Sequence, residues 1–264
     1  QIFRDTETGR ELKTLTGHSF WVLAVAIAPD GKTAISASGD NTLKIWDTET
    51  GRKLKTLTGH TSYVTAVAIA PDGKTAISAS LDTTLKIWDT ETGRELKTLT
   101  AHTKSVTAVA IAPDGKTAIS ASGDNTLKIW DTETGRELKT LTAHTKSVTA
   151  VAIAPDGKTA ISASGDKTLK IWDTETGREL KTLTAHTKSV TAVAIAPDGK
   201  TAISASRDNT LKVWDLFSGE EVGTFSGEHG FNCCAISPDG VSVVAVDTSG
   251  RVHFLRLEGV SGGG

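Results

Sequence analysis

The chain has 264 residues and a formal net charge of -2, with 29 Lys and Arg against 31 Asp and Glu. This balance excludes a general nucleic-acid-binding protein, which would carry a clear excess of positive charge. No run of about 18 apolar residues occurs, so we expect no membrane-spanning helix.

The chain has two cysteines, and they are adjacent, Cys233 and Cys234. Adjacent cysteines rarely form a disulfide without strain, so a reducing compartment, the cytoplasm, is expected. The two stand where another repeat has Ala192 and Val193. They are therefore predicted to be small core residues with no redox or metal role.

In chain order, the first predicted element is a strand, "GRELKTL", at residues 9–15. After it, a unit of 42 residues recurs, and each unit predicts four strands. In the unit that begins at residue 102 these are 106–112, 116–122, 126–131 and 136–142, separated by the turn sequences "APDG", "GD" and "TETG". The last predicted element is a third-type strand, "RVHFLRL", at residues 251–257. No helical pattern appears.

The copies of the unit are almost identical. The copies 102–143 and 144–185 differ only at Asn125 and Lys167. Such sameness indicates recent amplification of one unit, or design. A histidine and a tryptophan recur every 42 residues, at positions 18, 60, 102, 144 and 186 and at positions 46, 88, 130, 172 and 214.

Four strands per unit with His and Trp-Asp landmarks resemble the WD-repeat (WD40) β-propeller family. The resemblance implies an all-β fold, a single propeller over residues 1–259, with a flexible tail at 260–264. The last unit, "CCAISPDGVSVVAVDTSGRVHFLRLEG", is also similar to the closing repeat of long bacterial propeller arrays.

Counting strands predicts the number of blades. The last blade lacks a fourth strand, and the strand at 9–15 is a spare one of that type. Pairing them would close a monomeric ring of six four-stranded blades and remove two free edges. The alternative is a ring of seven or more blades built by assembly of chains.

Serine, histidine and aspartate recur in every unit, which raises the possibility of a catalytic triad. The family resemblance implies instead a structural tetrad with tryptophan, joined by hydrogen bonds. Five copies inside strands favour structure over catalysis, and the dispersed histidines predict no metal site. No cofactor is expected. The predicted tetrads are His18, Ser38, Asp40 and Trp46; His60, Ser80, Asp82 and Trp88; His102, Ser122, Asp124 and Trp130; His144, Ser164, Asp166 and Trp172; and His186, Ser206, Asp208 and Trp214.

The differences between copies fall in the loop after the histidine and at the residue before the turn aspartate. By the family resemblance both places lie on one rim, the top face, which usually takes partners. Aromatic or apolar residues fall on one half of it and basic residues on the other; these are Phe20, Trp21, Tyr63, Leu81 and Phe231, and Lys104, Lys146, Lys188 and Arg207. Such clusters predict a site for a protein or peptide. Alternatively, the aromatic residues fill gaps between blades and the lysines are ordinary solvated charge.

The sequence therefore predicts a non-catalytic scaffold or sensor module that binds protein or peptide partners, with no nucleic acid or membrane as partner. The alternative is a designed or recently amplified repeat protein with no dedicated ligand. The third hypothesis is that the protein is an enzyme. It would need a unique inserted nucleophile or acid, and the repeats contain none.

Overall fold

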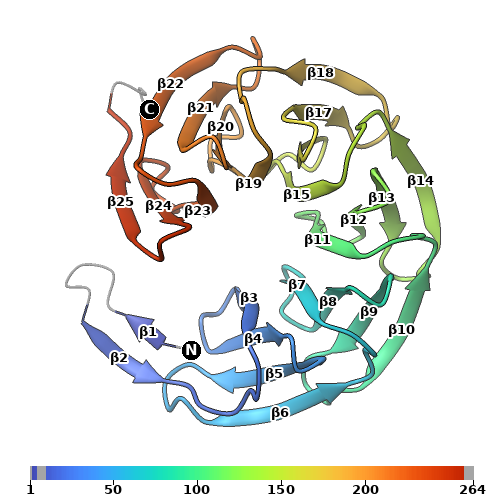
Figure 1. Cartoon of the computed structure of the whole chain (residues 1–264). Coiled ribbons are helices and arrows are strands. Elements are labelled where there is room, and N and C mark those ends of the chain that lie inside the picture. The colour runs from blue at the N-terminus through green and yellow to red at the C-terminus, as the bar shows by residue number, and fades with distance from the viewer. Residues whose placement is uncertain (1, 5–9, 259–264) are drawn as a thin grey trace.

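The structure is a computed structural model that describes residues 2–4 and 10–258. These residues form β-strands joined by turns, with no helix among them. Six antiparallel sheets, the blades, surround a central opening, and the first strand of each blade lies innermost (Figure 1). The predicted WD40-type propeller is confirmed. The predicted tail, 260–264, lies outside the described residues.

Five blades have four strands each, in sequence order from the centre outward. Blade 1 contains β3 (Val22–Ile27), β4 (Thr33–Ser38), β5 (Thr42–Asp47) and β6 (Lys53–Thr58). Blade 2 contains β7 (Val64–Ile69), β8 (Thr75–Ser80), β9 (Thr84–Asp89) and β10 (Glu95–Thr100). Blade 3 contains β11 (Val106–Ile111), β12 (Thr117–Ser122), β13 (Thr126–Asp131) and β14 (Glu137–Thr142). Blade 4 contains β15 (Val148–Ile153), β16 (Thr159–Ser164), β17 (Leu169–Asp173) and β18 (Glu179–Leu183). Blade 5 contains β19 (Val190–Ile195), β20 (Thr201–Ser206), β21 (Thr210–Asp215) and β22 (Glu221–Ser226).

Blade 6 has three strands, β23 (Phe231–Ile236), β24 (Ser242–Asp247) and β25 (Val252–Arg256). A separate two-stranded sheet at the N-terminus contains β1 (Ile2–Arg4) and β2 (Glu11–Thr14). We call this two-stranded sheet the half-blade.

The turns end the strands where the sequence predicts. In blade 3 the first turn closes with the Gly115 amide donating to the Ala112 carbonyl at 2.9 Å, with Gly115 at φ 72°. The left-handed conformation favours glycine there, because a side chain would be strained. Asp114 accepts a hydrogen bond from the Lys116 amide at 2.9 Å and so fixes the start of β12.

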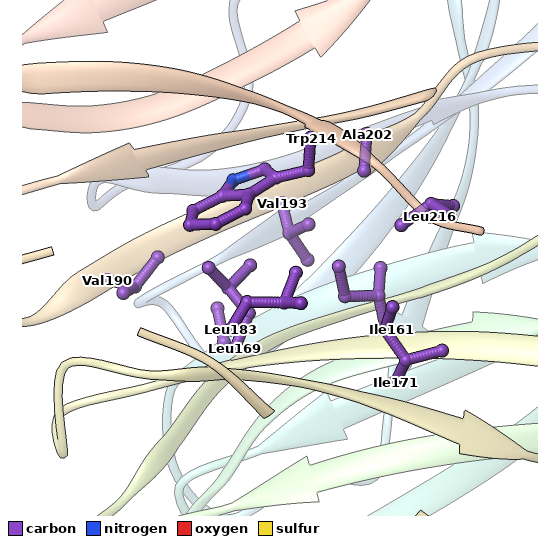
Figure 2. Packing of buried hydrophobic residues seen from close by; sticks show 10 residues of the cluster. Ile161, Leu169, Ile171, Leu183, Val190, Val193, Ala202, Trp214 and Leu216 are labelled. Carbon is purple, nitrogen blue, oxygen red and sulfur yellow. The ribbon is translucent and has the colours of Figure 1, made fainter. Parts of the chain in front are cut away.

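The core lies between successive blades. Each blade presents aliphatic side chains on one face to the tryptophan-bearing face of the next. Figure 2 shows this between blades 4 and 5, where Ile161 and Leu169 pack against Val193 and Trp214. Period-2 alternation places these two sets on opposite faces of every sheet. Every complete blade therefore needs a neighbour on both sides to bury its apolar faces.

Hydroxyl groups also join the innermost strands. Thr107 Oγ1 donates to the carbonyls of Ala121 in its own blade and Val148 in the next, at 3.0 and 2.6 Å. Thr65, Thr149 and Thr191 make the same bridge to the next blade. Leu23 occupies this position in blade 1 and has no hydroxyl to offer.

The predicted closing strand is wrong. Within the described residues, β2 pairs with β1 and not with β25, so blade 6 keeps three strands. The reason is that β1 is itself a third-type strand. It pairs Phe3 with Lys13 and Arg4 with Glu11 across a bulge, in the register in which β5 pairs with β6. The edge of β2 that β25 would need is therefore occupied. In Figure 1, β25 and the half-blade lie on opposite sides of the break in the ring.

Candidate functional site

The recurring polar side chains of each blade form one connected hydrogen-bond chain. In blade 3, Trp130 Nε1 donates to Ser120 Oγ at 2.8 Å, and Ser120 Oγ lies 2.7 Å from His102 Nε2. His102 Nδ1 lies 2.8 Å from the Asp124 carboxylate. Because a carboxylate only accepts, Nδ1 carries the proton and the serine hydroxyl donates to Nε2. The chain ties β12 and β13 to the loop that enters β11.

The predicted tetrads are right in histidine, aspartate and tryptophan and wrong in serine. The serines that join the chain stand two residues earlier, at Ser36, Ser78, Ser120, Ser162 and Ser204. The physical reason is register. Trp130 pairs with Ala118, so its indole reaches diagonally to Ser120, and Ser122 is two residues farther along the same face.

The serines predicted for the tetrads have another role. Ser122 Oγ accepts the Asp124 amide hydrogen at 3.1 Å and donates to the carbonyls of Lys104 and Ser105. Ser164 and Ser206 make the same contacts in their blades. Ser38 and Ser80 also accept the amide of the turn aspartate, and each donates to one loop carbonyl, that of Phe20 or Ser62. They hold the turn against the top-face loop.

A threonine that the sequence reasoning missed completes each network. Thr126 donates to the Asp124 carboxylate through its hydroxyl at 2.7 Å and its amide at 3.0 Å. The Thr103 amide donates to the other carboxylate oxygen at 3.1 Å. The sequence pattern "D-x-T", which contains this threonine, recurs in every complete repeat. Asp and Thr are also common in ordinary turns, so the pattern alone does not indicate that the threonine belongs to the network.

The pKa shifts are those expected of a structural hydrogen-bond network with an ionised aspartate and a neutral histidine. Burial alone would raise the pKa of Asp124, but hydrogen bonds from Thr126 and His102 outweigh it and bring the pKa to about 2. Burial lowers the pKa of His102, and Asp124 offsets this only in part. Ser120 is fully buried, so its hydroxyl cannot meet a substrate. The arrangement stabilises each blade and offers no nucleophile.

We expect acid to weaken the fold in two steps. The pKa values of the tetrad histidines, represented by His60, His102 and His186, are lowered from 6.5, so unfolding takes up protons as the pH falls below 6.5. The aspartates, with pKa values lowered from 3.8, add a second loss below about pH 4. Thermal unfolding by circular dichroism from pH 7.5 to 3 measures this. A midpoint that stays constant between pH 7 and pH 5 would contradict the buried neutral histidines.

Blade 6 has a different network. Asp247 is almost fully buried at the position of Ser38 and lies 3.0 Å from His253 Nε2. Asp247 Oδ1 also accepts from Ser249 and Arg251. The His253 ring contacts Phe225 and Phe231, with centroids 5.9 and 5.2 Å away.

A second repeated feature is a buried lysine with a glutamate on the outer strand. Lys86 Nζ lies 2.9 Å from Glu95 and 2.8 Å from Thr98 Oγ1. Lys128, Lys170 and Lys212 have the same pair of partners. Blade 1 differs, because Lys53 stands at the position of Glu95. Among the described residues, Lys44 Nζ then bonds only Thr56 Oγ1, at 3.3 Å.

We expect Lys53→Glu to stabilise the protein by about 1 kcal/mol, because it restores a half-buried, hydrogen-bonded ion pair to Lys44. Lys53→Gln removes only the repulsion of two cations and should give a smaller gain. Urea unfolding of the three proteins measures the difference. Equal stability of the Glu and Gln variants would contradict a restored ion pair.

Four of the predicted partner-binding residues form one exposed group, which we call the aromatic group: Phe20, Trp21, Tyr63 and Leu81. Phe20 lies 4.9 Å from Trp21 and 5.4 Å from Tyr63 between ring centroids, so it links blades 1 and 2. Leu81 donates its amide to the Tyr63 carbonyl at 2.9 Å. Trp21 is 71% exposed.

Gly39 makes room for the aromatic group. A Cβ at Gly39 would lie 2.5 Å from Phe20, whereas Gly123 and Gly165 in blades 3 and 4 have no neighbour closer than 3.6 Å. Phe20 therefore packs down over its own turn and supports the more exposed Trp21.

The fifth predicted aromatic residue does not belong to this group. Phe231 is fully buried and packs against Phe225 at 6.1 Å, so the prediction that it contacts a partner is wrong. Its backbone position is that of the buried residues Val64 and Val106, as the pairing with Asp247 shows. Phe231 occupies this strand position, and not a loop position, because the loop before β23 is one residue shorter than its counterparts.

The predicted basic residues are all exposed, at the equivalent loops of blades 3 to 5. They are Lys104, Lys146, Lys188 and Arg207. Arg207 donates its amide to the Ser189 carbonyl beside Lys188, the contact that Leu81 makes with Tyr63. The two variable places of each repeat are therefore adjacent, as the sequence predicts.

The WD domain, G-beta repeat family matches residues 9–47, 51–89, 93–131, 135–173 and 177–215. The chain therefore belongs to this family, whose fold is typically a non-catalytic scaffold. In the described residues no three His, Cys, Asp or Glu side chains come together in a way that could hold a metal ion, and no helix could span a membrane.

Curated relatives match single repeats only. The chain is similar to Protein FIZZY-RELATED 1 of Arabidopsis thaliana, 51% identical over 39 residues, which is 15% of this chain and 8% of that protein. It is similar to Nuclear distribution protein nudF 2 of Penicillium rubens, 50% identical over 38 residues, 14% and 8% of the two chains. It is also similar to Anaphase-promoting complex subunit cdh1 of Dictyostelium discoideum, 52% identical over 33 residues, 12% and 4% of the two chains. These relatives are eukaryotic.

Proposed function

We propose that this chain is a non-catalytic binding module that takes a protein or peptide on its top face. The observation that carries the proposal is the aromatic group, a contiguous set of exposed apolar side chains in a molecule whose other repeats carry small or charged residues there. Exposed aromatic clusters of this kind are typical of binding hot spots. The free thiols of Cys233 and Cys234 fit a protein of the reducing cytoplasm.

The two halves of the face suit one type of ligand. An apolar or aromatic side chain of the partner would insert beside Trp21 and Tyr63. Acidic groups nearby would meet Lys104, Lys146 and Lys188. The aromatic contact supplies most of the affinity, because exposed ion pairs contribute little and are screened by salt. The lysines would mainly raise the association rate.

We expect Trp21→Ala to weaken binding at least about tenfold, because a desolvated aromatic anchor is worth about 2 kcal/mol or more. The probe is a peptide selected from a random library on the full chain, with affinity measured by fluorescence anisotropy. Phe217→Ala is the matched control, since Phe217 is 89% exposed in the turn after β21, at the end of the blade away from the tetrad loops.

Selected peptides should carry an aromatic residue flanked by acids. Their affinity should survive Phe217→Ala and fall modestly with added salt. A library that yields no enriched sequence would instead favour the alternative of an amplified repeat with no dedicated ligand. Loss of binding on Phe217→Ala but not on Trp21→Ala would place the site on the opposite face.

A further inference from the structure

The half-blade consists of the outer two strands of a blade. The pairing of β1 with β2 repeats the pairing of β5 with β6, including the bulge at the same step. The strands that would lie inside β1, a first-type and a second-type strand, have no counterpart in this sheet.

The half-blade also packs against blade 1 in the way that the outer strand of blade 1 packs against blade 2. A Cβ at Gly51 would lie 3.3 Å from Leu15 and 3.2 Å from Lys13. A Cβ at the equivalent Gly93 would lie 3.1 Å from Leu57 and 2.8 Å from Lys55 of the preceding blade. Leu15 is buried, as Leu57 is. The outer part of this position in the ring is therefore filled.

The inner part of the position is open on the side of blade 1. Val25 on β3 is 52% exposed, whereas the equivalent Val67 on β7 is 8% exposed. Leu23 and Ile27 on the same strand are exposed as well. In the other blades this strand packs against the preceding blade, so β3 presents an apolar face that no strand among the described residues covers.

The position is open on the side of blade 6 too. Phe254 is 67% exposed, and Val244 and Val252 beside it are exposed. Their pairings place them where Ile77, Leu85 and Ile87 stand in blade 2, all buried against blade 3. Cys233, predicted to be a core residue, is exposed on this same face, and that prediction is wrong.

We propose that the position between blade 6 and blade 1 binds a β-hairpin of another chain, made of a first-type and a second-type strand. The hairpin would carry alternating small apolar and hydroxyl residues around a Pro-Asp-Gly turn. One face would cover Phe254, Val244 and Val252, and the other would cover Val25 and Ile27. Its second strand would add to the free edge of β1, which supplies backbone hydrogen bonds as in other strand additions.

The internal hairpins show that such a segment matches both sides. In the hairpin 148–164, Val148 and Ala160 pack against the aliphatic face of blade 3. From the same hairpin, Ile161 and Ala163 pack against blade 5. One hairpin thus buries an apolar set on each face, as the open position requires.

A second copy of this chain is a poorer occupant. All of its own hairpins from blades 2 to 5 are already packed between two blades, and releasing one would uncover two cores. The fitting partner is a repeat protein or peptide that presents such a hairpin unpaired.

The test uses the full chain and a synthetic peptide of residues 148–164. Cys233 is the reporter, because it is exposed on the face to be covered, whereas burial raises the pKa of Cys234 to about 12 and leaves it unreactive. Saturating peptide should slow alkylation of Cys233 at least about tenfold, since only the peptide-free fraction reacts. Native mass spectrometry should show one peptide per chain.

Two controls make the result specific. The peptide of residues 126–142 has the same length but is the outer hairpin, a place that the half-blade already fills, so it should give no protection. Phe254→Asp, at an exposed residue, should weaken binding of peptide 148–164 at least about tenfold.

Three results would overturn the proposal. The first is unchanged alkylation with saturating peptide 148–164. The second is a monomer whose Cys233 is already protected without peptide, which would mean that the ring closes on itself. The third is a dimer with protected Cys233, which would make a second copy the occupant.

Discussion

Asp124→Ala is expected to destabilise the protein by about 3–5 kcal/mol, because it removes one partner of a buried, hydrogen-bonded pair. The Asp124 carboxylate accepts from His102, from the Thr103 amide and twice from Thr126. Its loss leaves two amides and the N–H of the buried His102 ring without their acceptor. Urea unfolding monitored by circular dichroism measures the change.

Asp114→Ala in the same blade is the matched control. Asp114 is also a turn aspartate, but it is exposed and accepts one hydrogen bond, from the Lys116 amide. Its removal should cost about 1 kcal/mol or less. If the two variants lost equal stability, the network around His102 would contribute no more than an ordinary turn contact. This result would contradict the interpretation that the tetrads stabilise the blades.

The fold could be predicted from the sequence because each level of information agrees. Turn residues recur at fixed offsets. The strands that lie between the turns, such as 126–131, alternate large apolar and polar residues. A repeat this regular leaves only the ring closure open. That part failed because β1, which has an Arg in place of tryptophan, still pairs in the third-strand register with β2. Competition between two strands for one edge is a tertiary effect that no local pattern reveals.

The candidate site was predicted in part, for a related reason. Residue types at the tetrad were clear, but Ser120 and Ser122 lie on the same strand face, so choosing between them needs the register with Trp130. The exposed aromatic group was identifiable because it departs from the repeat. Phe231 departs from the repeat too, yet it is buried, because a loop one residue shorter moves it into the strand position of Val64.

The register of the tetrad can be tested through coupling energies. We expect Ser120→Ala and Trp130→Phe to be coupled by about 1–3 kcal/mol, because each removes one end of the same 2.8 Å hydrogen bond. Ser120→Ala alone leaves both the indole N–H and the His102 Nε2 unpaired in a buried place. Once Trp130 is Phe, the indole N–H is gone and part of that penalty disappears. A double-mutant cycle by urea unfolding gives the coupling.

Ser122→Ala combined with Trp130→Phe supplies the contrast. Ser122 is equally buried, and its loss should also destabilise the protein, because the Asp124 amide loses its acceptor. It makes no bond to Trp130, so the two changes should add to within about 0.5 kcal/mol. If Trp130→Phe were coupled to Ser122→Ala and additive with Ser120→Ala, the sequence-based prediction that Ser122 is the tetrad serine would be supported. Coupling to Ser120 alone would show that the diagonal reach of the indole across the strand pair selects the serine, since burial does not distinguish the two.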